Sequence, residues 1–67
     1  MRDFENIYTY HEPKDTQPQR YESIRKKARE LATLIELSCP DSVEKATAHT
    51  KLEEAVMWAN ASIARNE

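Results

Sequence analysis

The chain has 67 residues, a net charge of −2, a single cysteine and no glycine. A chain this short forms one domain and rarely folds on one core alone, and Cys39 has no disulfide partner, so we expect self-association. The missing glycines disfavour tight β-turns and phosphate-cradling loops, and the apolar runs are too short to span a bilayer. Because no signal-peptide pattern opens the chain, we expect a cytosolic protein with no membrane partner.

The first seventeen residues are predicted to form a short helical arm and a linker. Residues 1–10 place Phe4, Ile7 and Tyr8 at helical spacing, but one or two turns of helix are marginal alone and must dock on another surface. Residues 11–17 are predicted to be the linker, because prolines disfavour helix in the residues before them.

The first long helix is expected over residues 18–39, since proline is tolerated in the first helical turn and Pro40 follows the end. Its apolar residues recur at alternating intervals of three and four, which is the heptad spacing of packed helices. This row consists of Tyr21, Ile24, Ala28, Leu31 and Ile35. On the same helical wheel Arg25 and Lys27 flank the row, whereas Lys26 points away from it.

The second long helix is expected over residues 41–65. Asp41 with Glu44 three residues later is a variant of the capping box, and Ser42 is the alternative cap. The connection between the long helices is only three or four residues, and connections this short make antiparallel neighbours.

The most apolar segment of the chain is 52–66, LEEAVMWANASIARN. Between Ala55 and Ala64 only Asn60 and Ser62 are polar, so this helix is apolar nearly all round. Such a helix has to be buried nearly all round, and one hairpin covers a single side. We therefore predict an all-α single domain, residues 1–67, in which a short N-terminal arm precedes a long antiparallel helical hairpin, assembled as a homo-oligomer.

The charge pattern points to a small anionic ligand rather than to long nucleic acid. Residues 20–29 hold five basic residues against Glu22 alone, whereas the segments on either side are acidic in sum. A long nucleic acid favours a broadly basic surface. The alternative is a solvated helix face with ion pairs such as Glu22–Lys26.

Catalytic, metal and cofactor motifs are missing from the sequence. The only histidines, His11 and His49, make no recognisable dyad with a nucleophile, and Glu53 and Glu54 diverge on a helix. We therefore do not expect an enzyme, a bound metal or a cofactor. What remains is an aromatic group on the arm and linker, Tyr8, Tyr10 and His11, beside the basic helix. Aromatic rings stack on nucleobases and cations neutralise phosphate, although tyrosines on an arm are also common as anchors in a groove.

Five blocks of the sequence carry a family resemblance. They are YTYHEPK, RYESIRKKARELA, Ile35, CPDS and LEEAVMWANASIARN. Together these blocks resemble the phage anti-CBASS proteins that act as cyclic-oligonucleotide sponges. The resemblance implies a compact homo-hexamer that binds cyclic dinucleotides such as 3′,3′-cGAMP between protomers without degrading them, and cyclic trinucleotides in separate pockets. It also implies that sequestering the messenger keeps the host's CBASS effector inactive during infection.

The resemblance also implies site residues. Tyr10, with its neighbour His11, matches the arm tyrosine of the dinucleotide site, and the basic residue of that site is matched by Arg25, Lys26 or Lys27. Arg65, in the IARN ending, is the candidate for the trinucleotide pocket. The alternative function is a helical oligomeric interaction protein that docks on a phage or host protein.

Overall fold

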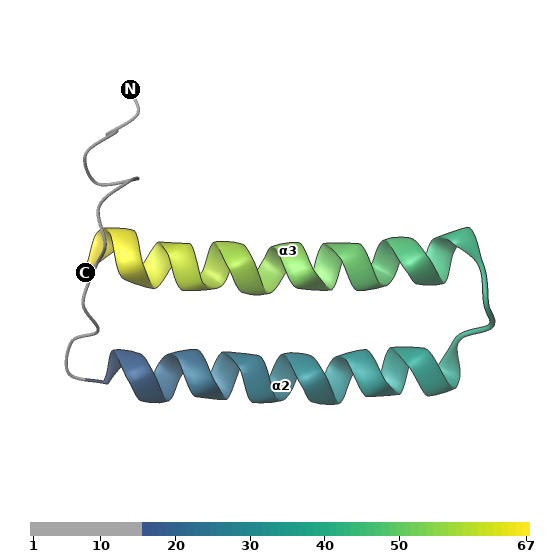
Figure 1. Ribbon diagram of the computed structural model, residues 1–67, viewed down its shortest axis with the longest axis horizontal. Helices are drawn as coiled ribbons and strands as arrows, with labels where there is room; N and C mark the ends of the chain where they lie inside the picture. The colour runs from purple at the N-terminus through teal and green to yellow at the C-terminus, as the bar shows by residue number, and fades with distance from the viewer. Residues whose placement is uncertain (1–15) are drawn as a thin grey trace, which may run out of the picture.

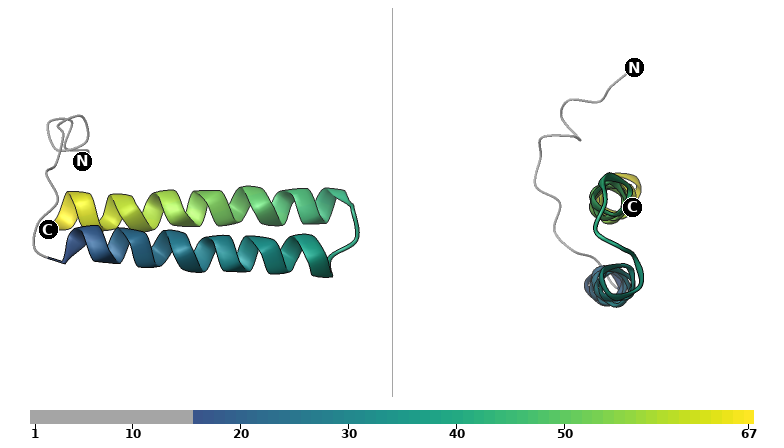
Figure 2. Two further views of the ribbon diagram at one scale, coloured as in Figure 1. Left: turned by 60° about the horizontal axis from the view of Figure 1, so that its bottom comes forward. Right: turned by 90° about the vertical axis from the view of Figure 1, so that its right-hand side faces the viewer.

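The computed structural model describes residues 16–67, which form an antiparallel pair of helices. Helix α2 (Gln17–Ser38) and helix α3 (Val43–Asn66) lie side by side as a hairpin (Figure 1). Seen end-on, the hairpin is a single layer of two helices (Figure 2). No strand occurs in residues 16–67, so the described part of the chain is all-α as predicted. The predicted arm and nearly all of the linker lie outside the described residues.

Helix α2 ends where the next proline requires it. Cys39, the residue before Pro40, is extended with φ −107° and ψ 136°, because a proline disfavours the helical region in the residue before it. The Cys39 amide still donates to the carbonyl of Ile35 at 3.0 Å. At the other end, the Arg20 amide donates to the carbonyl of Thr16 at 3.0 Å. Helix α2 thus begins and ends one residue earlier than the expected range 18–39.

Helix α3 is capped by Ser42, not by Asp41. The Ser42 hydroxyl oxygen accepts from the Lys45 amide at 3.1 Å, which satisfies one of the free amides at the helix start. The same hydroxyl donates to the carbonyl of Pro40 at 3.1 Å. The helix therefore begins at Val43, two residues later than predicted.

The two helices meet along one row of apolar side chains. In α2 the row is the predicted heptad row, and in α3 it consists of Leu52, Val56, Ala59 and Ile63. These side chains are half-buried, except Leu31, which stays 45% exposed. No apolar side chain in residues 16–67 is fully buried. The hairpin by itself therefore has a contact line and no closed core.

Large apolar side chains point away from this contact line. Their exposed fractions range from 60% for Leu34 and Met57, through 61% for Trp58, to 79% for Val43 and 81% for Leu37. Leu34 and Leu37 belong to α2, and the others to α3. No helix of the described part is long and apolar enough to cross a membrane.

Lys45 closes the loop end of the hairpin. Its side chain is only 9% exposed, and its ammonium lies 2.6 Å from a carboxylate oxygen of Glu36. It also donates to the Glu36 carbonyl and to Asp41 Oδ1, each at 3.0 Å. The hydrogen bond to Glu36 is the main reason that the pKa of Lys45 is raised. Lys45 thus meets a free carbonyl in the last turn of α2, where the helix dipole favours a cation.

Arg20 and Glu67 close the open end. Arg20 Nη1 donates to Glu67 Oε2 at 2.8 Å, Nη2 donates to Oε1, and Gln17 Nε2 adds a bond to Oε1 at 3.4 Å. The hydrogen bond from Arg20 lowers the pKa of Glu67 from 4.5 to about 2. Gln17 is the one buried residue of the described part.

Replacing Glu67 with glutamine should change how stability depends on pH. Because the pKa of Glu67 is lower in the folded chain, its contribution is complete above pH 4.5 and is lost as pH falls toward 2. The effect should be small, since the side chains of Arg20 and Glu67 are 40% and 43% exposed. We expect the variant to melt below the wild type at about pH 6, with the difference vanishing near about pH 2.

Thermal unfolding followed by circular dichroism across this range measures the difference. Glu53→Gln is the matched control, because Glu53 is exposed in the interior of α3, away from the helix ends, and has no ion pair with any residue of 16–67. A Glu67→Gln difference that is constant with pH would show that Glu67 does not titrate with folding.

Candidate functional site

Two arginines on one side of α2 share a single carboxylate. Arg25 Nη2 donates to Glu22 Oε2 at 2.7 Å, and Arg29 Nη2 lies 3.6 Å from Glu22 Oε1. The hydrogen bond from Arg25 is the first cause of a lowered pKa for Glu22, and the charge of Arg29 adds to it. The alternative of a helix face with exposed ion pairs is thus met by other partners than its example Glu22–Lys26, since Glu22 pairs with Arg25 and Arg29.

Two grooves run along the hairpin, one on each side of the contact line. We call the first the arginine groove; it is lined by Arg25, Ala28, Arg29, Ala32, Leu52, Glu53 and Val56. We call the second the apolar groove; it is lined by Ser23, Ile24, Lys27, Ala28, Leu31, Leu52, Ala55, Val56 and Ala59. They share Ala28, Leu52 and Val56, which belong to the row where the helices meet. The grooves therefore open on opposite faces of the hairpin.

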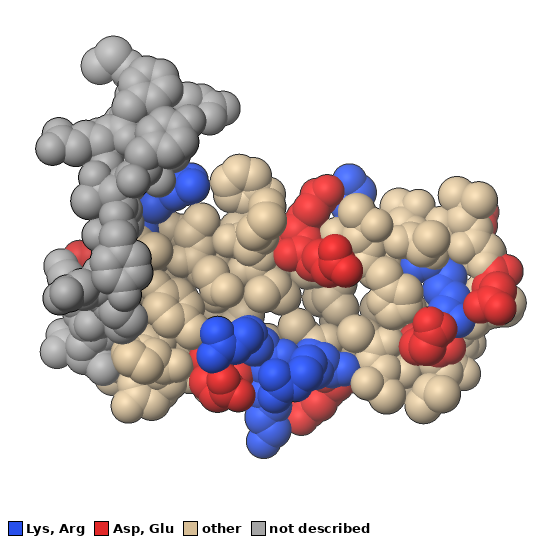
Figure 3. Space-filling model, viewed as in Figure 1, with Lys and Arg blue, Asp and Glu red and all other residues tan. Residues whose placement is uncertain are grey.

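The arginine groove combines charge with an apolar floor. Its α2 wall carries Arg25 and Arg29, and its α3 wall carries Glu53. Figure 3 shows this face, with basic side chains gathered over the middle of α2 and acidic side chains over α3 opposite them. Glu53 makes no ion pair with a residue of 16–67, although its neighbour Glu54 lies 3.7 Å from Lys51. The groove, of about 340 Å³, can therefore hold an anionic group against α2.

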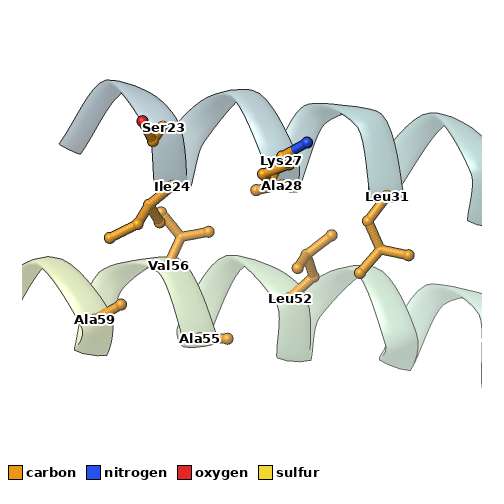
Figure 4. Close-up of a pocket in the computed structure, with 9 residues that line it drawn as sticks. All are labelled: Ser23, Ile24, Lys27, Ala28, Leu31, Leu52, Ala55, Val56 and Ala59. Atoms are coloured by element: carbon orange, nitrogen blue, oxygen red, sulfur yellow. The ribbon is translucent and has the colours of Figure 1, made fainter. Parts of the chain in front are cut away.

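The apolar groove is larger, about 440 Å³, and carries one charged residue. Figure 4 shows Ile24 and Leu31 of α2 pointing toward Leu52 and Val56 of α3. Lys27 lies at its edge, 3.7 Å from Glu30 on the same helix. This groove is suited to apolar contact.

The three cations predicted from the sequence do not converge within one chain. Arg25 and Lys27 flank the contact line as expected, but this places them in different grooves. Lys26 is exposed, lines neither of these grooves and makes no ion pair with residues 16–67. A ligand seated in one of these grooves therefore has either Arg25 or Lys27 in the groove lining.

The other predicted site residues lie elsewhere. Tyr10 and His11 are outside the described residues. Arg65 is exposed in the last turn of α3, where a cation is favourable to the helix dipole. Arg65 and Trp58 are seven residues apart and share the side of α3 that faces away from α2. Arg65 is thus separated from both grooves.

Sequence reasoning left out of the site two residues of the arginine groove, Arg29 and Glu53, and also Glu22, which pairs with both arginines but does not line the groove. The spacing of Glu22, Arg25 and Arg29, three and then four residues apart, is the signal that places them on one helix side. Glu53 could not be found in this way, because its position opposite Arg25 depends on the register between the helices.

A further polar pocket lies at the loop end, lined by Glu36, Asp41, Ser42, Lys45, Ala46 and His49. His49 Nε2 lies 3.7 Å from Glu36 Oε1, beside the Lys45 contacts. Within residues 16–67 no group of three His, Cys, Asp or Glu side chains could hold a metal ion, and Cys39 is exposed and free. The loop-end pocket is accounted for by the bonds that close the hairpin.

Comparison with protein families gives one match. A model described as "Acb2/Tad1, hairpin domain" matches residues 2–64, which is nearly the whole chain. Comparisons with curated proteins and with solved structures find no match. The matched family is the anti-CBASS sponge family that the sequence blocks resemble, and its hairpin is the fold found in residues 16–67. The chain therefore belongs to the Acb2/Tad1 hairpin-domain family.

Proposed function

We propose that this protein is a phage anti-defence sponge, which binds cyclic oligonucleotide messengers such as 3′,3′-cGAMP without degrading them. Sequestration in the host cytosol would keep CBASS effectors inactive. The observation that carries the proposal is the family match over residues 2–64. A sponge needs a place for phosphate and no catalytic group, and the arginine groove offers such a place.

The proposed assembly is a homo-hexamer with ligands bound between protomers. Support comes from the burial pattern, because residues 16–67 leave every apolar side chain at least partly exposed. Trp58 and Met57 extend this apolar surface around α3, with exposed fractions of 61% and 60%. Exposed aromatic and methionine side chains in a small helical protein are typical of a surface that another chain covers.

Trp58→Glu should disrupt this assembly. A charge at a position exposed in the hairpin costs the single chain little, but an unpaired charge buried between chains is strongly unfavourable. We expect wild-type protein to be assembled at micromolar concentration and the variant to dissociate, as measured by light scattering after size exclusion. Thr33→Glu, which adds the same charge at an exposed position of α2, is the control and should stay assembled. A folded wild-type monomer would contradict the proposed assembly.

The proposed dinucleotide site joins the arm to α2. A cyclic dinucleotide presents two bases and two phosphates, so it needs stacking and cationic contacts together. Tyr10, with His11 beside it, would supply the stacking surface, and Arg25, Lys26 or Lys27 would meet a phosphate. The net charge of −2 would repel long nucleic acid while a local basic site still accepts a small dianion.

Tyr10→Ala should weaken binding of 3′,3′-cGAMP by about ten- to a hundredfold, because one stacking contact of roughly 1–3 kcal/mol is lost. Tyr10→Phe is the matched control, since it keeps the ring and should bind within about threefold of wild type. At least one of Arg25→Ala, Lys26→Ala and Lys27→Ala should lose at least about tenfold. Calorimetric titration measures these affinities, with oligomer size checked for each variant.

Recovery of the ligand after denaturation tests the absence of catalysis. The proposal requires that 3′,3′-cGAMP be released intact. Chemically altered ligand would mean an enzyme, and wild-type affinity in all four alanine variants would place the site elsewhere.

Arg65→Ala should lower the affinity for cyclic trinucleotides and leave the affinity for cyclic dinucleotides unchanged, because Arg65 is separated from both hairpin grooves. A lost cationic contact to phosphate is expected to cost about tenfold or more in affinity. Lys51→Ala is the matched control, because Lys51 is an exposed cation two heptads earlier on the same side of α3. Equal losses for both ligand classes would indicate one shared pocket or a loss of assembly.

One observation favours the alternative function, a docking protein. Leu34 and Leu37 of α2 and Val43 of α3 are strongly exposed near the loop end of the hairpin. An apolar cluster there suits contact with a phage or host protein. Absence of binding to any cyclic oligonucleotide would favour this alternative.

A further inference from the structure

The contacts of Glu22 show that Arg25 and Arg29, the two arginines of the arginine groove, can bind one anionic group together. Its two carboxylate oxygens are approached by different guanidinium groups, Oε2 by Arg25 at 2.7 Å and Oε1 by Arg29 at 3.6 Å. Residues four apart on a helix are neighbours on one side of it. Both side chains therefore reach one planar oxyanion without any change in the backbone.

We propose that Arg29 is a second phosphate-binding residue, which forms with Arg25 a clamp for one phosphodiester in the place that Glu22 takes in the chain without ligand. The inference rests on the proposed function and adds a residue to it. The two non-bridging oxygens of a phosphodiester present a pair of acceptors, as a carboxylate does. Guanidinium groups meet such a pair through parallel N–H donors, which a lysine ammonium cannot do.

The charges of the groove place the phosphate on the α2 wall. Glu53 stands on the α3 wall and would repel a second anion there. The floor between the walls, Ala28, Ala32, Leu52 and Val56, suits the apolar faces of a sugar or base. The apolar groove, on the opposite face, has a single charged residue in its lining, Lys27, and this residue lies beside Glu30. The arginine groove is therefore the better match for a ligand that is anionic on one side and flat on the other.

Displacing Glu22 should be easy. The Glu22 side chain is 58% exposed, and those of Arg25 and Arg29 are 53% and 67% exposed. Ion pairs this open to water contribute little, so the carboxylate can return to solvent when a phosphate replaces it.

Titration of 3′,3′-cGAMP into matched variants tests the clamp. Arg29→Ala should lose about ten- to a hundredfold in affinity, as expected when a charged hydrogen-bonding partner is removed. Arg29→Lys keeps the positive charge but lacks the paired N–H donors of a guanidinium group. Its loss of affinity should therefore lie between those of wild type and Arg29→Ala. Lys51→Ala removes an exposed cation of α3 that lines neither groove, so its affinity should stay within about twofold of wild type. Circular dichroism and light scattering confirm that each variant keeps its helix content and assembly.

Two results would overturn the clamp while leaving the proposed function intact: wild-type affinity in Arg29→Ala, or a loss in Lys51→Ala as large as that in Arg29→Ala. If wild-type protein binds no cyclic di- or trinucleotide, the proposed function fails, and inorganic pyrophosphate then tests the clamp by itself. Its addition should shift the Nε–Hε nuclear magnetic resonance signals of both Arg25 and Arg29 in wild-type protein, and Arg29→Ala should reduce the shift at Arg25. Unchanged signals at both arginines would overturn the clamp.

Discussion

The single contact line between α2 and α3 is the constraint on which the rest of the molecule depends. Two helices can cover only one side of each other, so the apolar residues on the line are covered by the partner helix and stay open toward the grooves beside it. Val56 and Ile24 are thus half-buried in the middle of the hairpin. The same geometry leaves a groove on each side of the line, and these grooves are where another chain or a ligand can bind.

Polar bonds at both ends favour the register that brings the groove walls together. At the loop end Lys45 holds Glu36 and Asp41, and at the open end Arg20 holds Glu67. An apolar row of mostly small and branched side chains would tolerate a slip of one helix against the other, whereas directional bonds at the ends do not. The register that results places Glu53 opposite the arginines of α2.

The two grooves divide the chemistry expected of a sponge. The apolar groove, with one charged residue in its lining, resembles the core of a protein interface, where charge is depleted. The arginine groove has charge on both walls, so a second protomer would cover it only at the cost of desolvating those groups. Under the proposed function, a small anion with flat rings would bind there, with its charge on the arginines and its rings on the apolar floor. Sequestration follows from binding alone, which is consistent with a family of hairpin domains that serve as sponges.

The sequence by itself determined the helices, their antiparallel pairing and the contact row, because these follow from local spacing, prolines and a short connection. It also determined the family, since the blocks that carry the resemblance are contiguous. It did not decide between Asp41 and Ser42 as the cap, because both spacings fit and only the backbone angles at Ser42 select one.

Only the tertiary structure placed Glu53 of α3 opposite Arg25 and Arg29 of α2. A helical wheel gives the angles between residues of one helix, but a groove has two walls, and the second wall comes from the partner helix. Which residue of α3 stands opposite Arg25 depends on the axial register between the helices. Interactions between residues far apart in the sequence fix that register, and no pattern within either helix contains it.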